Sequence, residues 1–154
     1  MKIRLSTVVP PPAALLIGIA LIWGLSEWFP AFHFDMAGRS WIAWSLFAIG
    51  LGLMLVAAWS LQRAHTTINP IWPDHAKHLV TSGIFRFSRN PIYLGDATIL
   101  LGMVFWFGNW AGLAIVAAFL LFIDRFQIRA EESALRRLFG TGYEHYLRRV
   151  RRWL

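Results

Sequence analysis

Residues 97–123 read ATILLGMVFWFGNWAGLAIVAAFLLFI, a stretch without a charged side chain. The stretch is longer than the roughly 20 apolar residues that one helix needs to cross a bilayer. A Gly-Asn pair at 108–109 stands near its middle between two tryptophans, and these residue types favour turns. We therefore predict a tight hairpin of two short helices at about 92–107 and 110–126, with one long tilted helix as the alternative.

Two further uncharged runs lie in the first half of the chain. Residues 5–26 predict a span at about 13–29, after the three prolines at 10–12. A secretory signal peptide has a similar basic start and apolar run, but no small-residue cleavage site follows here, so we expect an uncleaved span. Residues 40–62 predict a second span at 40–61.

The composition sets the class of protein. The chain has 154 residues, of which 57% are hydrophobic and 15% charged, whereas soluble domains carry about 25% charged residues. We expect an all-α integral membrane bundle that forms one domain over 1–154. The absence of cysteine excludes disulfides and thiolate metal ligands, and we expect no metal. A net charge of +7 in so apolar a chain favours anionic lipid headgroups over nucleic acid as a partner.

The distribution of charge predicts the topology. The segment 63–89 has four basic residues against one acid, and the tail from residue 124 has eight arginines against four acids. The segment 27–39, by contrast, carries a net negative charge. Four spans place every basic segment on one face, as the positive-inside rule requires, whereas three spans would leave the tail outside. We expect four spans with both termini cytoplasmic, in the inner membrane of a bacterium or archaeon.

Several polar features lie outside or at the ends of these spans. Residues 66–73 have the prolines and Asx/Thr residues of an ordered loop. Glycines at 140 and 142 are expected to break an arginine-rich tail into two helices, which alone could simply lie on the bilayer. Asp124 is expected to be a solvated helix end. Asp96 either pairs with a nearby arginine, Arg86 or Arg89, or faces a polar pocket.

The segment 81–95 combines features of a small-molecule site. Pro91 can start a helix at its first turn, and helix N-terminal amides beside Arg89 would favour an anion. Aromatic side chains such as Tyr93 can stack on a flat ring. The Glu131–Glu132 pair would supply carboxylates for a cation and hydroxyls, or would only form an ion-pair network with nearby arginines. Together the two segments suit a zwitterionic nucleoside.

Three motifs occur in a specific order. Residues 78–85 read HLVTSGIF, residues 89–95 read RNPIYLG, and residues 131–146 carry Glu-Glu followed by Phe-Gly and two tyrosines. This pattern resembles the isoprenylcysteine carboxyl methyltransferase and phospholipid methyltransferase family of integral membrane enzymes. The resemblance covers about 66–153, more than half of the chain.

The resemblance implies S-adenosylmethionine as the methyl donor, bound at the cytoplasmic side. The predicted cofactor-binding residues are Lys77, His78, Leu79, Val80, Gly83, Phe85, Asn90, Pro91, Ile92, Tyr93 and Glu131. The predicted catalytic residues are Arg89, Tyr93 and Glu132, and the predicted substrate contacts are Arg125, Gln127 and Arg129.

The chain departs from the family pattern at three positions. Lys77 and Asn90 replace histidines, and Gln127 stands where the family has an arginine that serves the substrate. Arg125 and Arg129 are candidates to replace that arginine.

We therefore expect a membrane-embedded methyltransferase with an amphipathic acceptor. Isoprenylcysteine carboxyl O-methylation is the leading expectation. Phospholipid N-methylation and S-methylation of a small thiol are the alternatives within methyl transfer. A non-catalytic subunit whose basic tail binds anionic lipid is the alternative of another class. The methyltransferase interpretation requires the segment around Tyr93 and the Glu131–Glu132 pair to close over the same small molecule.

Overall fold

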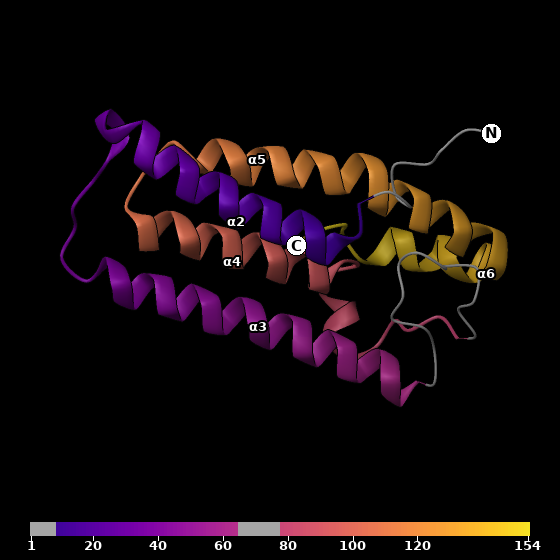
Figure 1. Ribbon diagram of the computed structural model, residues 1–154. Helices are drawn as coiled ribbons and strands as arrows, with labels where there is room; N and C mark the ends of the chain where they lie inside the picture. Colours follow the sequence, from indigo (N-terminus) through magenta and orange to yellow (C-terminus); the bar gives the residue numbers. More distant parts are fainter. Residues whose placement is uncertain (1–8, 65–77) are drawn as a thin grey trace, which may run out of the picture.

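The computed structural model describes residues 9–64 and 78–154, which fold into helices packed side by side (Figure 1). The long helices are α2 (Pro11–Trp28), α3 (Arg39–Arg63), α4 (Pro91–Phe107), α5 (Gly112–Phe122) and α6 (Arg129–Arg149). Shorter helical segments are η1 (Pro30–Phe32), η3 (Gly83–Arg86) and the π-helical η4 (Ile123–Ile128). The described residues contain no strand, only an isolated bridge between His33 and Asn109. The predicted all-α class is therefore confirmed.

The helix boundaries follow the sequence closely, with two corrections. The first helix begins at Pro11, inside the run of prolines that was expected to precede it. Proline is accommodated there because the first-turn N–H groups of a helix have no intrahelical partner. The helix expected at 110–126 divides into α5 and η4, and η4 continues into α6 without a break.

The predicted hairpin between α4 and α5 is present. Gly108 ends α4 in a left-handed conformation with φ 64°, which glycine adopts without steric cost. Asn109 is fully buried, and its side-chain amide donates to the Phe29 carbonyl at 3.0 Å. The turn is therefore tied to the end of α2.

Two of the helices are long and apolar enough to cross a membrane by themselves. These are α2, with a mean hydropathy of 1.3, and α3, with 2.0, whereas α4 is a shorter apolar helix. Only 17% of the apolar window of α3 is buried inside the protein, and Trp41, Trp44 and Trp59 are among its exposed side chains. Such a surface suits contact with lipid. The four-span topology remains a prediction.

The α3–α4 interface depends on glycines. A Cβ atom added at Gly95 would lie 2.6 Å from the Gly50 carbonyl oxygen, and one added at Gly50 would lie equally close to the Gly95 oxygen. The two backbones therefore touch directly. On the other side of α4, a buried core joins it to α2 and α5, with Ile22, Leu100 and Val104 fully buried.

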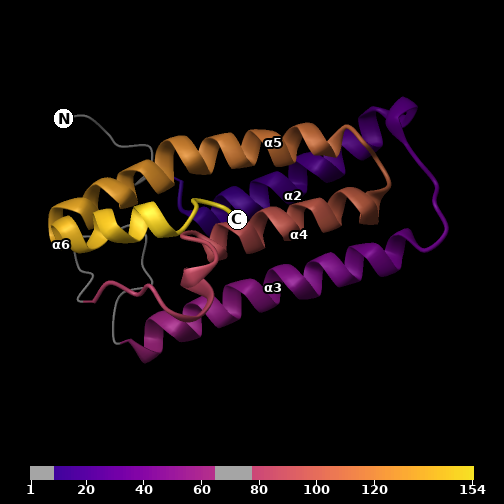
Figure 2. The same ribbon diagram turned by 180° about the vertical axis from the view of Figure 1, so that it is seen from behind.

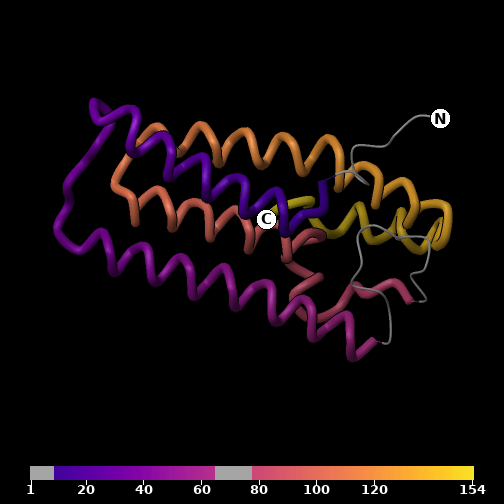
Figure 3. The backbone as a smooth tube through the Cα atoms, in the orientation of Figure 1, coloured from indigo at the N-terminus to yellow at the C-terminus, as the bar shows by residue number. Residues whose placement is uncertain are grey.

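The C-terminal tail folds back on the bundle. Gly140, inside α6, leaves the helical conformation at φ 49° and ψ −123°, so the predicted break of the tail is confirmed. Figures 2 and 3 show the second half of α6 returning towards the start of α4. The backbone N–H of Arg89 then donates to the Arg151 carbonyl at 3.1 Å. The start of α2 lies at the same end of the bundle (Figure 1).

Candidate functional site

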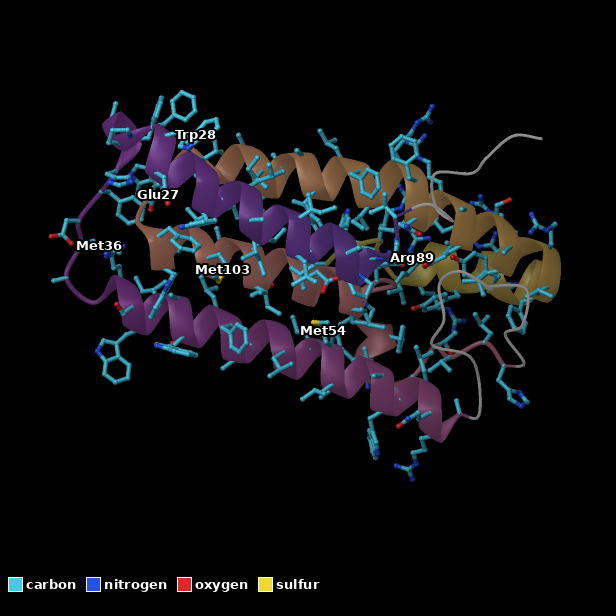
Figure 4. All side chains as sticks on the ribbon, viewed as in Figure 1. Glu27, Trp28, Met36, Met54, Arg89 and Met103 are labelled. Carbon is cyan, nitrogen blue, oxygen red and sulfur yellow. The ribbon has the colours of Figure 1, made fainter. Side chains whose placement is uncertain are left out.

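The site is built at the corner between η3 and α4. Gly83 starts η3 with φ 61°, and Pro91 occupies the first turn of α4. Asn90, just before the proline, has φ −131° and ψ 54°, outside the helical region that a following proline disfavours. This corner lies beside the returning tail, and Figure 4 shows Arg89 at this end and Glu27 and Trp28 at the opposite one.

Tyr93 and Glu131 are in direct contact. The Tyr93 hydroxyl donates a hydrogen bond to Oε1 of Glu131, so the first turn of α4 touches the first turn of α6. Burial raises the pKa of Glu131 to about 7, against a lowering effect of the Tyr93 hydrogen bond, and the neighbouring Glu132 raises it further. Glu131 can therefore change its charge near neutral pH.

Glu132 lies at the centre of an ion-pair network. Its Oε1 atom is 3.2 Å from Nη1 of Arg89, and Arg152 binds both of its oxygens at 3.1 and 2.7 Å. Arg152 also contacts Oδ1 of Asp124 at 2.8 Å. The hydrogen bond to Glu132 raises the pKa of Arg152, so this guanidinium stays charged. Asp124 is thus part of the network, and its expected role as a solvated helix end is wrong.

Neutral hydrogen bonds fix the tail against the corner. The Asn90 side chain donates to the Arg152 carbonyl at 2.8 Å, and the Tyr146 hydroxyl donates to the Phe85 carbonyl at 2.6 Å. Burial raises the pKa of the Tyr146 phenol, which remains a neutral donor. Leu79 packs against the buried tail cluster of Tyr143, Tyr146 and Val150. The 78–90 segment is therefore held by the tail.

One polar group of this site has no partner among residues 9–64 and 78–154. The Nε atom of Arg89 is buried there without a hydrogen-bond acceptor, while Nη1 of the same guanidinium binds Glu132. A buried N–H without a partner costs free energy, and a ligand carboxylate would satisfy it. Glu131, which hydrogen-bonds only a neutral phenol among the described residues, suits a cation or hydroxyls. The residues present therefore fit a zwitterionic nucleoside cofactor.

A pocket opens on the α3 side of η3. It has a volume of about 400 Å³ and is lined by Trp59, Ser60, Arg63, Ala64, Val80, Ser82 and Gly83. Two of these residues, Val80 and Gly83, were predicted to contact the cofactor. Neither Glu131 nor Glu132 lines this pocket.

The three predicted substrate contacts have separate surroundings. Arg125 is exposed on η4, whereas Gln127 is buried and donates to the Val9 carbonyl at 2.9 Å. Arg129 lies 3.4 Å from Asp124 at the edge of the ion-pair network. Gln127 therefore contacts the backbone just before α2, whereas Arg129 contacts Asp124.

The remaining predicted cofactor-binding residues differ in their exposure. Pro91 and Phe85 are buried in the corner, Ile92 is half-buried, and His78 is exposed. Lys77 and the loop expected at 66–73 lie outside the described residues.

One of the two alternatives for Asp96 is excluded, and one contact of the site was not predicted. Asp96 is 2% exposed and, within the described ranges, forms no ion pair with Arg86 or Arg89, so the polar environment stays a prediction. The contact of Arg152 with Glu132 was missed, because this arginine stands among similar ones at 148–152.

Comparisons of the sequence with known proteins identify the family. The family model described as phospholipid methyltransferase matches residues 39–142, from α3 into α6. An uncharacterized protein of Haemophilus influenzae is 44% identical over 66 residues, which is 41% of this chain and all of that protein.

A fission yeast enzyme is also related. The protein-S-isoprenylcysteine O-methyltransferase of Schizosaccharomyces pombe is 34% identical over 77 residues, half of this chain and 32% of that enzyme. The chain thus spans about a third of the yeast enzyme's length. No solved structure matches. Because the family model covers more than half of the sequence, this chain belongs to the phospholipid methyltransferase family.

Proposed function

We propose that this protein is a membrane-embedded, S-adenosylmethionine-dependent methyltransferase whose methyl acceptor is amphipathic. Members of the family are methyltransferases, and the chain has two helices able to cross a membrane. The proposal treats 1–154 as one catalytic domain with four spans and both termini in the cytoplasm.

A single observation carries the proposal. Tyr93 and Glu131 meet in a hydrogen bond beside Arg89, whose buried Nε atom has no acceptor in the part of the chain that the structure describes. One site thus offers a carboxylate on one side and an unsatisfied guanidinium N–H on the other. A methionine-derived zwitterion joined to a ribose carries the complementary groups.

The chain's own residues would bind and orient the reactants. Arg89 would hold the cofactor carboxylate, and Glu131 would hold its cationic or hydroxyl groups, while Tyr93 fixes the Glu131 side chain. Glu132 and Arg152 would keep the tail closed over the site and exclude water. The cofactor supplies an activated methyl group, so orientation is the main contribution of the protein, worth up to about 7–11 kcal/mol in favourable cases.

Two acceptor chemistries follow from the relatives. The yeast enzyme's name favours O-methylation of an isoprenylcysteine carboxylate, and the family model favours methylation of a phospholipid. A carboxylate needs no base at neutral pH, whereas an amine must first lose a proton. Either acceptor would enter from the bilayer.

Methyl transfer is tested with purified protein in nanodiscs and S-adenosylmethionine labelled at the methyl group. Label in the lipid extract that depends on Arg89 supports the proposal, since Arg89→Gln should abolish it while Arg137→Gln, on the exposed face of α6, should not. Base-stable label indicates N-methylation, and base-labile, volatile label indicates an ester. Absence of label with both acceptor types would favour the non-catalytic, lipid-binding alternative.

A further inference from the structure

The pocket between the last turns of α3 and η3, here called the α3–η3 pocket, has a volume of about 400 Å³. The two elements lie beside each other in both views of the ribbon (Figures 1 and 2). A Cβ atom added at Gly83 would lie 3.7 Å from Oγ of Ser60, so α3 and η3 approach closely at one edge of the pocket. Pockets that hold small ligands have volumes of roughly 300–1,000 Å³. The α3–η3 pocket is therefore large enough for a lipid headgroup.

The charge that lines the α3–η3 pocket is positive. Arg63 is exposed on the last turn of α3, and its guanidinium carbon lies 5.3 Å from the centre of the Trp59 ring. Within residues 9–64 and 78–154, Arg63 forms no ion pair, and no aspartate or glutamate lines the pocket. A guanidinium that stacks on an aromatic face can still direct its N–H groups to an anion. The pocket therefore suits an anionic ligand.

Two hydroxyl groups of the pocket have different hydrogen-bonding capacity. The Ser60 hydroxyl donates to the Val56 carbonyl at 2.7 Å, so its oxygen is left to accept a hydrogen bond from a ligand. Ser82 is exposed, and its side chain forms no hydrogen bond with any other residue that the structure describes. Its hydroxyl can therefore donate to a phosphate oxygen. A ligand that carries both a phosphate and a hydroxyl group would satisfy the two serines.

The side of α3 that leads to the pocket changes from apolar to basic along the helix. Four residues at positions i, i+3, i+4 and i+7 share this side: Val56, Trp59, Ser60 and Arg63. Val56 and Trp59 are both exposed, and only 17% of the apolar window of α3 is buried inside the protein. Apolar, tryptophan and basic side chains in this order suit acyl chains, the membrane interface and headgroups in turn.

The lining of the pocket distinguishes between candidate ligands. An acidic phospholipid such as phosphatidylglycerol carries one net negative charge and headgroup hydroxyls. A zwitterionic phospholipid adds a cationic group, for which no described residue of the pocket offers a carboxylate. S-adenosylmethionine would place its ammonium and sulfonium groups near Arg63. A soluble phosphate ester has a suitable charge, but it has no acyl chain to cover the exposed side of α3. Charge and shape together therefore favour the acidic phospholipid.

We propose that the α3–η3 pocket binds the headgroup of an acidic phospholipid that is not the methyl acceptor. Arg63 and Ser82 bind the phosphate, Ser60 accepts a hydrogen bond from a headgroup hydroxyl, and the acyl chains lie along the exposed side of α3. The bound lipid thereby connects α3 to η3. Phosphatidylglycerol has neither an amine nor a carboxylate to methylate, so this lipid is a bound partner and not a substrate. The inference is therefore independent of the proposed methyl transfer.

The test titrates short-chain phosphatidylglycerol into the protein in a neutral detergent, without cofactor. Native mass spectrometry gives the number of bound lipids and the dissociation constant. Arg63→Gln is compared with Arg86→Gln, the matched control. Arg86 is also exposed, and its guanidinium carbon lies 5.2 Å from the centre of the Phe87 ring, but it does not line the pocket. Parallel titrations use phosphatidylcholine of the same chain length and glycerol 3-phosphate. S-adenosylhomocysteine is added as a competitor.

The inference predicts that wild type and Arg86→Gln bind one phosphatidylglycerol molecule with similar dissociation constants. The constant of Arg63→Gln should be about tenfold higher, because a charge-assisted hydrogen bond is lost. Ser82→Ala removes a hydroxyl donor at the exposed edge of the pocket and should raise the constant about threefold. Phosphatidylcholine should bind wild type about tenfold more weakly than phosphatidylglycerol. Glycerol 3-phosphate should not bind, and S-adenosylhomocysteine should not displace the lipid.

Four results would overturn the inference. Equal weakening by Arg63→Gln and Arg86→Gln would mean that the lipid responds only to the overall positive charge. Equal affinity for phosphatidylcholine would remove the role of charge in the pocket. Binding of glycerol 3-phosphate as tight as that of the lipid would assign the pocket to a soluble phosphate ester. Displacement by S-adenosylhomocysteine would assign it to the cofactor. If Arg63→Gln fails to fold, Ser82→Ala decides, and absence of methyl transfer would leave all these results unchanged.

Discussion

The Tyr93 hydroxyl donates a hydrogen bond to Glu131, a residue 38 positions later in the chain and on another helix. This contact joins the corner between η3 and α4 to the Glu131–Glu132 pair. It also links a phenol on α4 to a tail carboxylate whose pKa burial raises to about 7. We therefore expect the affinity for the cofactor to depend on pH and on the presence of the Tyr93 hydroxyl.

Binding of S-adenosylmethionine should tighten as the pH rises. Glu131 is mostly protonated at pH 6 and mostly a carboxylate at pH 8, because burial raises its pKa to about 7. The carboxylate attracts the cationic cofactor, so the dissociation constant should fall about tenfold between pH 6 and pH 8. Calorimetry at three pH values checks this. If the dissociation constant of Glu131→Gln changes with pH by the same factor, the pH dependence belongs to another group.

Tyr93→Phe should shift the midpoint of this pH dependence to a higher pH. The hydrogen bond from Tyr93 lowers the pKa of Glu131, so its removal raises that pKa and weakens cofactor binding at pH 7. Tyr146→Phe is the matched control, because that hydroxyl binds the Phe85 carbonyl and not a carboxylate. The two variants are compared by the midpoint of affinity against pH. An equal shift in both would mean that loosening of the tail causes the effect.

Arg152→Gln should destabilise the closed tail. The variant leaves Glu132, whose side chain is 8% exposed, with Arg89 as its remaining ion-pair partner in the described structure. Loss of hydrogen bonds to a charged group costs about 1.5–3 kcal/mol. Limited proteolysis of the tail in detergent measures the opening. Arg136→Gln breaks an exposed pair with Glu144 and should cost at most about 1 kcal/mol; equal cleavage of both variants would contradict the account.

Gly95→Ala should separate α3 from α4. The added Cβ would lie 2.6 Å from the Gly50 carbonyl oxygen and equally close to Met54, and overpacking of this kind costs about 1–3 kcal/mol. Thermal unfolding in detergent should show the loss. Gly52→Ala, on the partner helix α3, is the control, because a Cβ added there meets no neighbouring atom within 4 Å. A melting temperature unchanged by Gly95→Ala would show that the helices are not in backbone contact.

Local features of the fold were predictable because each has a local cause. Uncharged runs predicted α2 to α5, the Gly-Asn pair predicted the α4–α5 turn, and the glycines at 140 and 142 predicted the break in the tail helix. The start of α2 at Pro11 and the π-helical turn at 123–128 were not predicted. A π-helix has no signature in apolar periodicity, because it adds a single residue to an otherwise regular helix.

The site was predictable where its residues belong to a recognisable motif, and not where it depends on ion pairs that only the folded tail determines. The order of motifs pointed to Tyr93 and Glu131, which the structure brings into contact. The pairing of Arg152 with Glu132 and Asp124 depends on the fold of the tail beyond the end of α6. Neighbouring arginines in the sequence are chemically equivalent, so only the packed chain distinguishes Arg152 from them.

The central claim is that the corner at Tyr93 and the glutamate at 131 bind one cofactor together. Titration of S-adenosylhomocysteine into the detergent-purified protein tests it, with Glu131→Gln and the exposed Glu144→Gln compared in parallel. We expect binding to wild type and Glu144→Gln with similar dissociation constants, and a constant about tenfold higher for Glu131→Gln, since a charge-assisted contact is lost. No heat of binding with wild type, or equal affinity in all three proteins, would contradict the account.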